Sequence, residues 1–172
     1  MKRHPTSVPA AVGATVLLTL ALLTGCSGRP VDRAATPSAS PSAPGTAITA
    51  ERVKSALEAR LGANEARFGS GTGSPCSTSS ARMFAADCGL AARAAGADAS
   101  FALEQIEGQR GFATLRTVAQ KLRTAVASYE RLGCAGDPAP AATRHACLAP
   151  AAVIAQGFPD LRDGANLGLR GA

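Results

Sequence analysis

The sequence is poor in aromatic residues and in histidine. Its 172 residues include no tryptophan, one tyrosine, five phenylalanines and two histidines. Proteins that bind single-stranded nucleic acid need aromatic side chains on which the bases stack, so this composition argues against a nucleic-acid partner. Histidine is the most frequent general acid or base in enzymes, and its scarcity narrows the catalytic mechanisms open to the chain.

The common cofactor, metal and nucleophile motifs are also missing. No C-x-x-C pair occurs, which excludes the usual zinc spacings and the C-x-x-C-H attachment of a c-type haem. The glycines at 69, 71 and 73 lack the third glycine of a dinucleotide fingerprint, and no G-x-S-x-G elbow is present. Residues 160–171 lack the ligands of a calcium loop. We therefore predict neither a cofactor nor a metal.

The N-terminus has the pattern of a secretory signal peptide. Lys2 and Arg3 precede an apolar run over 10–23, which is shorter than the roughly 20 residues that span a bilayer. The next residues, Leu-Thr-Gly-Cys at 23–26, resemble the lipobox of bacterial lipoproteins, whose cysteine receives a diacylglyceryl group before cleavage. The resemblance implies a signal peptide over 1–25 and a lipid anchor at Cys26, on the extracytoplasmic face of the cell membrane. A plain signal peptide with an incidental cysteine is the alternative.

The predicted mature chain consists of a tether and one domain. Residues 26–45 are rich in serine and proline, which predicts a disordered spacer, and one domain is expected over 46–172. Without Lys2 and Arg3, 16 basic residues remain beside 12 acidic ones. Their signs alternate along the candidate helices, as on a solvated surface. The membrane, through the lipid anchor, is therefore an expected partner, and nucleic acid is not.

From residue 46 onward the apolar residues recur with helical period, and no stretch has the alternation of a strand. The clearest run covers 112–129 and ends before Gly133. Other helices are expected from about Thr49 to Gly62, from Ser79 or Ser80 past Gly96, over 141–156 with a kink or interruption at Pro150, and from Pro159 to 169. These segments predict an all-α, antiparallel bundle of about four helices.

Two features of the domain extend this prediction. Gly164 and Gly168 lie four residues apart in the last helix, which predicts close packing within the molecule, because charged neighbours exclude a membrane span. The alanine, arginine and glycine bias and the closing LRDGANLGLRG resemble small uncharacterised lipoproteins of high-GC Gram-positive bacteria. That resemblance implies no particular activity.

Cys76, Cys88, Cys134 and Cys147 form an even set that predicts two disulfides in an oxidising compartment. A helix from about Ser79 through Cys88 would place Cys88 roughly 14 Å from its start, which is too far for a bridge to Cys76. Cys76 with Cys134 and Cys88 with Cys147 would then lie at matching levels of the bundle. We therefore predict this crossed pairing, while a break in the helix before Cys88 would restore pairing of sequence neighbours.

Few residues offer chemistry for catalysis. His145 is the only histidine after the signal peptide, and Asp137 or Asp163 would have to assist it. Asp160 and Asp163 would share a helix face, but acidic residues are common in a first helical turn, and we assign no site to them. We expect a non-catalytic envelope module that binds a protein, a wall polymer or a small ligand. The alternatives are a hydrolase that uses His145 and an inhibitor or protector of an exported enzyme.

Overall fold

Five α-helices and two short 3-10 turns make up residues 44–170, the part of the chain that the computed structural model describes. The elements are α1 (Pro44–Phe68), η1 (Gly71–Gly73), α2 (Ala86–Gln105), α3 (Ala113–Arg131), η2 (Cys134–Gly136), α4 (Ala141–Ala155) and α5 (Gly157–Gly168). The predicted signal peptide, Cys26 and nearly all of the predicted tether lie outside the described residues. Within them, no helix combines the length and the apolar character needed to cross a membrane.

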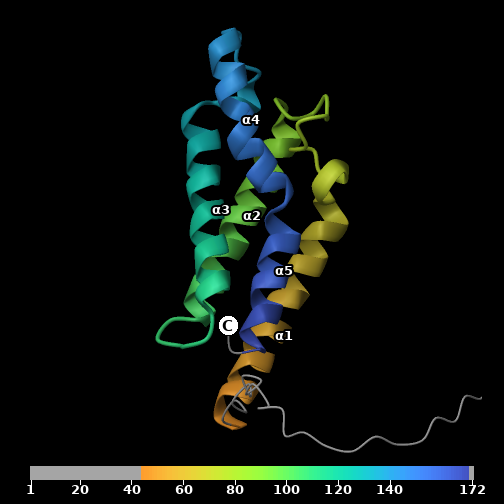
Figure 1. The fold of residues 1–172 in the computed structure, drawn as a ribbon. Coiled ribbons are helices and arrows are strands. Elements are labelled where there is room, and N and C mark those ends of the chain that lie inside the picture. Colours follow the sequence, from red (N-terminus) through yellow and green to blue (C-terminus); the bar gives the residue numbers. More distant parts are fainter. Residues whose placement is uncertain (1–43, 171–172) are drawn as a thin grey trace, which may run out of the picture. The chain divides into compact units, whose positions relative to one another are not determined.

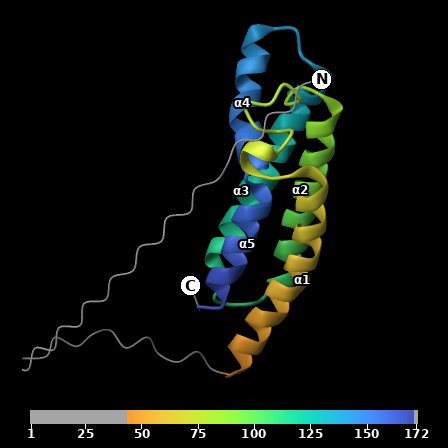
Figure 2. The same cartoon turned by 90° about the vertical axis from the view of Figure 1, so that its right-hand side faces the viewer.

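The helices form an antiparallel bundle of four rods, which confirms the predicted fold class (Figures 1 and 2). Three of the rods are single helices, and the fourth is a pair of consecutive helices. α1 and α3 run in one direction, and α2 runs in the other (Figure 1). The fourth rod consists of α4 followed by α5, and both run antiparallel to α3. α3 packs against α2, α4 and α5, while α1 packs against α2 and α5. The core therefore lies on the common axis of the four rods.

α3 forms where the apolar stripe predicts it. Leu115, Leu122 and Tyr129 recur every seven residues along one face and are almost completely buried. The helix ends at Arg131, and Gly133, two residues later, adopts the left-handed conformation that favours glycine, with φ of 64°. Both the helix and its glycine terminator are confirmed.

α1 is longer at both ends than the sequence predicts. It begins at Pro44 rather than at Thr49, and it continues past Gly62 to Phe68. A β-carbon at Gly62 would meet no atom within 4 Å, so this glycine is exposed inside the helix and does not end it. Gly69, with φ of 70°, follows the observed end, and its N–H donates to the Glu65 carbonyl.

The predicted start of the second helix at Ser79 or Ser80 is wrong. Residues 74–85 fold through successive tight turns, in which the N–H groups of Ser77 and Ser80 donate to the carbonyls three residues earlier. α2 begins only at Ala86, and it runs through Gly96 as expected. Serine hydroxyls bond locally in this loop, as in the pair Ser77 and Ser79 at 2.9 Å, and so compete with helix formation.

This late start also overturns the crossed disulfide pairing. Cys76 is bonded to Cys88 and Cys134 to Cys147, with Cα–Cα distances of 4.8 and 5.9 Å. The turns fold the chain back, so that Cys76 returns to the first turn of α2. The straight helix that excluded a bridge between these neighbours does not exist.

The fourth rod is divided between Ala155 and Gly157, and not at Pro150, which lies buried inside α4. α5 approaches α3 closely at its glycines. A β-carbon at Gly164 would lie 2.9 Å from the Leu115 Cα atom, and one at Gly168 would overlap the Phe112 ring. The close intramolecular packing predicted for the α5 glycines is confirmed.

Candidate functional site

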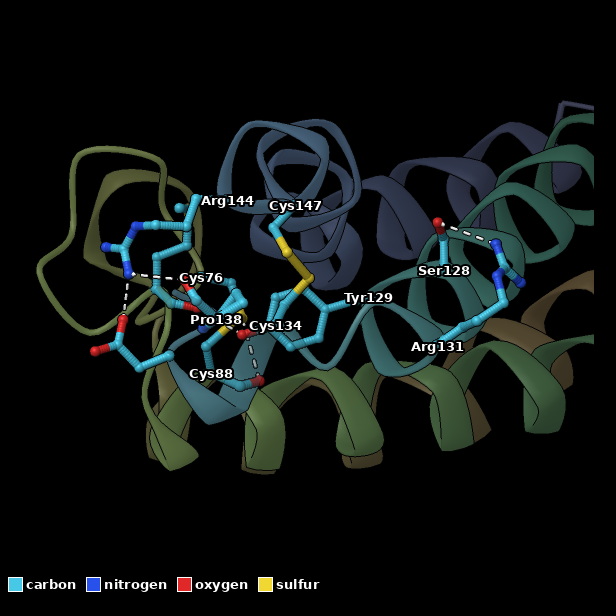
Figure 3. The surroundings of a disulfide bond; sticks show 11 residues. Cys76, Cys88, Ser128, Tyr129, Arg131, Cys134, Pro138, Arg144 and Cys147 are labelled. Carbon is cyan, nitrogen blue, oxygen red and sulfur yellow. Dashed lines mark hydrogen bonds and ion pairs between the residues drawn. A yellow bond between two sulfur atoms is a disulfide. The ribbon is translucent and has the colours of Figure 1, made fainter. Parts of the chain in front are cut away.

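Both disulfides lie near one end of the bundle, close to the end of α3 (Figure 3). All four cysteines are completely buried. Gly89 follows Cys88 and packs so tightly that a β-carbon there would lie 2.9 Å from the Ala135 β-carbon, next to Cys134. The Cys76–Cys88 disulfide therefore holds the 74–85 loop to the start of α2, and the Cys134–Cys147 disulfide holds η2 to α4. Their burial indicates a structural role, because reactive disulfides need access.

Tyr129 joins the same end of the bundle to the 74–85 loop. Its ring is buried, and its hydroxyl donates a hydrogen bond of 2.5 Å to the Met83 carbonyl. Burial raises the pKa of Tyr129 to about 12, because the charged phenolate would lose its hydration. As the single tyrosine of the chain, it is a spectroscopic reporter of this contact.

The residues weighed for catalysis are not brought together. His145 is exposed on α4. Asp137 forms an ion pair with Arg144 instead, and the Arg144 guanidinium lies 3.9 Å from the centre of the Phe84 ring. Asp163 is exposed on α5. Among residues 44–170, no hydrogen bond or ion pair joins His145 to either aspartate.

Asp160 lies half-buried in the first turn of α5. Burial raises its pKa, the positive charge of Lys121 opposes this, and the negative charge of Asp163 adds to it. In the part of the chain that the structure describes, no group of three histidine, cysteine or acidic residues has the geometry to hold a metal ion.

A buried carboxylate that we did not predict connects α1 and α2. Asp98 is completely buried, accepts a hydrogen bond of 2.7 Å from the Asn64 amide and forms an ion pair of 3.1 Å with Arg60. The Arg60 guanidinium also lies 4.4 Å from the centre of the Phe101 ring. The sequence contains a signal for this buried carboxylate, because Asp98 lies on the same helix face as the buried alanines Ala91, Ala95 and Ala102.

A second network joins α5 to α1. Arg162 binds the Glu58 carboxylate through Nε and the Glu65 carboxylate through Nη2, with shortest distances of 2.9 Å in both cases. Glu65 also accepts a hydrogen bond from the Ser70 hydroxyl, which is the main reason that its pKa is lowered, and Arg162 adds to the effect. The pKa of Arg162 is raised, chiefly by its hydrogen bond to Glu58. Arg162, Glu58 and Glu65 are therefore paired within the molecule.

The opposite situation holds along the outer face of α2 and α3. Two rows with seven-residue spacing flank the contact between these helices: Arg93, Ser100 and Glu107 on α2 and its following turn, and Arg116, Arg123 and Glu130 on α3. Three overlapping hollows lie between the rows. In order from the disulfide end to the opposite end of the bundle, their volumes are about 410, 320 and 520 Å³. We call this surface the α2–α3 groove.

The register across the groove is antiparallel. Arg93 and Glu130 line the hollows at the disulfide end, Ser100 and Arg123 share the middle, and Arg116 lines the far hollow with Glu107. Opposite charges therefore occupy the same level at each end. The floor between the rows is made of small and apolar residues, among them Gly96, Ala97, Leu103, Val126 and Ala127.

The charged side chains of the groove take part in no ion pair within residues 44–170. The ion pairs of that region involve Arg60, Arg82, Arg144 and Arg162 with their acidic partners. Arg116 donates to the Ile106 carbonyl, and it too has no acidic partner there. The groove thus combines a narrow apolar floor with charges of both signs that form no ion pair within residues 44–170.

Comparison with known proteins gave no match. No family model, curated protein or solved structure matches the chain.

Proposed function

We propose that this protein is a lipid-anchored module of the cell envelope, which is held outside the membrane through Cys26 and binds a macromolecular partner through the α2–α3 groove. The observation that carries the proposal is the pair of buried disulfides in a chain whose N-terminus resembles a lipobox. Disulfides of this kind form and persist in exported proteins, and the lipobox leads to the same compartment. The 17 residues from 27 to 43, which precede α1, then act as a spacer.

The groove supports a binding role through its charge arrangement. Charges that are paired within the molecule, such as those around Arg162, contribute little to recognition. Arg93, Arg123 and Glu130 remain available to a partner. Complementary charges at an interface mainly provide specificity and faster association, while the apolar floor provides contact area.

Detergent phase separation of cells that produce the full chain tests the anchor. We expect the wild-type protein in the detergent phase and Cys26→Ala in the aqueous phase or unprocessed, because two acyl chains hold a protein stably at a membrane. Ser27→Ala, which keeps the acylated cysteine, is the matched control and should behave as wild type. Equal partitioning of wild type and Cys26→Ala would contradict the proposal.

A further inference from the structure

The α2–α3 groove has a charge pattern that is complementary to itself. At the disulfide end Arg93 lies beside Glu130, and at the other end Glu107 lies beside Arg116. If a second copy faces the groove with a two-fold axis parallel to the helices, α2 of one copy lies on α3 of the other at the same level. Each arginine then meets the glutamate of the second copy.

We propose that the groove binds a second copy of this chain, and that the two copies pack in parallel with α2 against α3. This inference rests on the proposed role of the groove as the interaction surface. In the antiparallel alternative, with the two-fold axis across the helices, Arg123 near the midpoint would meet Arg123 of the second copy. In the parallel arrangement Arg123 meets Ser100 instead, so like charges do not face each other.

The floor of the groove allows close approach. Gly96, Ala97 and Ala127 present almost no side chain between the two charged rows. A β-carbon at Gly96 would already lie 3.2 Å from a Val126 methyl carbon, so α2 and α3 lie close together along the floor. The hollows above it form a long, open groove with charged margins, which suits a pair of helices better than a small ligand, because a small-ligand site encloses most of the ligand surface.

The expected contact is small. Each charged row spans 15 residues, whose 14 steps correspond to about 21 Å of helix, and two packed helices are about 20 Å wide. The resulting area of roughly 400 Å² per copy is below the roughly 800 Å² of a stable complex. Association in free solution should therefore be weak. Anchoring both copies in one membrane raises their effective concentration, and the parallel arrangement places both tether ends on the same side.

The test uses two differently tagged full chains in the same cells. A photo-crosslinking residue replaces Ala127, which is exposed in the groove, and irradiation should give an adduct that carries both tags. The probe at Ala59, which is exposed on α1, is the control and should give no such adduct. Tryptic mapping should place the link on residues 94–110 of the second copy. A link on residues 117–121 would contradict the parallel arrangement.

Charge reversal separates contacts between copies from contacts within one copy. An acidic variant combines Arg93→Glu with Arg116→Glu, and a basic variant combines Glu107→Arg with Glu130→Arg. Each variant paired with itself should lose the adduct at least about tenfold, because like charges then face each other. The acidic variant paired with the basic one should restore it. Arg52→Glu with Arg170→Glu makes the same charge change at exposed sites off the groove and should have no effect.

Three results would overturn the inference: no doubly tagged adduct in wild type, an adduct with a different protein only, or no recovery when the two variants are mixed. Thermal unfolding of each variant establishes that it is folded, and Arg93→Gln with Arg116→Gln replaces the acidic variant if that one unfolds. Detergent partitioning of the same cells reports on the anchor independently. A released chain that still forms the adduct would contradict the anchor alone.

Discussion

Asp98 on α2 accepts a hydrogen bond of 2.7 Å from the Asn64 amide on α1 and is completely buried. Arg60, one helical turn before Asn64, forms an ion pair of 3.1 Å with the other carboxylate oxygen. A buried carboxylate is costly unless its oxygens are hydrogen-bonded, so these two α1 residues must face α2 in the native state. Asp98 therefore fixes the register of α1 against α2.

Removal of one partner should destabilise the bundle. We expect Asn64→Ala to lower the free energy of unfolding by about 1–3 kcal/mol, because one oxygen of Asp98 then lacks its donor. The double variant Asn64→Ala with Asp98→Ala should lose less than the sum of the single changes. Urea unfolding measures all three, with Ser55→Ala on the exposed side of α1 as control. Additive losses would show that the hydrogen bond does not couple the helices.

Two glycine-to-alanine substitutions should have opposite effects. At Gly164 the new methyl group would lie 2.9 Å from the Leu115 Cα atom, and α5 would have to move, at a cost of about 1–3 kcal/mol. At Gly62 the methyl group meets nothing within 4 Å, so alanine should stabilise α1 by about 0.5–1 kcal/mol. Thermal unfolding of the two variants decides this. Equal shifts in midpoint would contradict the described contact between α3 and α5.

Stability at high pH should depend on Tyr129. Its pKa in the folded protein is about 12, against an ordinary value of 10.0. The folded state therefore holds the proton more tightly, and this contribution is fully present below pH 10 and is lost as the pH rises toward 12. The loss amounts to about 3 kcal/mol. Because Tyr129 is the single tyrosine, absorbance at the phenolate band follows it directly.

Tyr129→Phe is the matched control for this titration. It removes the hydrogen bond to the Met83 carbonyl and should lower stability at neutral pH by about 1–2 kcal/mol. It should also abolish the part of the alkaline loss that belongs to the phenol. A wild-type phenolate transition centred near pH 10 in the folded protein would show that the hydroxyl is not buried as described.

The disulfide pairing makes a direct prediction for peptide mapping. Trypsin cuts after Arg82 between the first pair and after Arg144 between the second. Without reduction, residues 68–82 should remain linked to 83–93, and residues 132–144 to 145–162. A link between the peptides of Cys76 and Cys134 would contradict the structure and restore the crossed pairing.

Loss of one disulfide should weaken the domain measurably. Each bridge closes a loop of 12 or 13 residues, which corresponds to about 3 kcal/mol in the chain-entropy treatment. We expect Cys134→Ala with Cys147→Ala to lose about this amount in chemical unfolding. The corresponding change at Cys76 and Cys88 should also free the 74–85 loop for proteolysis after Arg82. Unchanged stability in both variants would show that the bridges are dispensable.

The amphipathic helices could be predicted from the sequence because their signal is local. The stripe through Leu115, Leu122 and Tyr129 specifies α3, and Gly133 specifies its end. The start of a helix is hard to predict where several neighbouring residues could each cap its first turn, as before α2. The serines before α2 bond within their own turns, and a pattern of residue types does not distinguish such turns from a helix cap.

Features that depend on two distant segments could not be predicted in the same way. The ion pair of Arg162 with Glu58 joins positions 104 residues apart. The charged residues of the groove lie opposite one another only after α2 and α3 have packed together. The crossed disulfides followed from an assumed straight helix, so one wrong helix start changed the pairing. Asp98 could have been noted as a charged residue on an alanine face, but its partners on α1 could not be identified.

The intact mass of the protein purified without reduction from membranes of producing cells tests the proposed envelope module most directly. We predict a chain that begins at Cys26, carries a diacylglyceryl group and lacks two hydrogen atoms for each of its two disulfides. Reduction should add those hydrogens back and leave the lipid in place. A chain that begins at Met1, or one that starts at Cys26 without lipid or contains free thiols before reduction, would contradict the proposal.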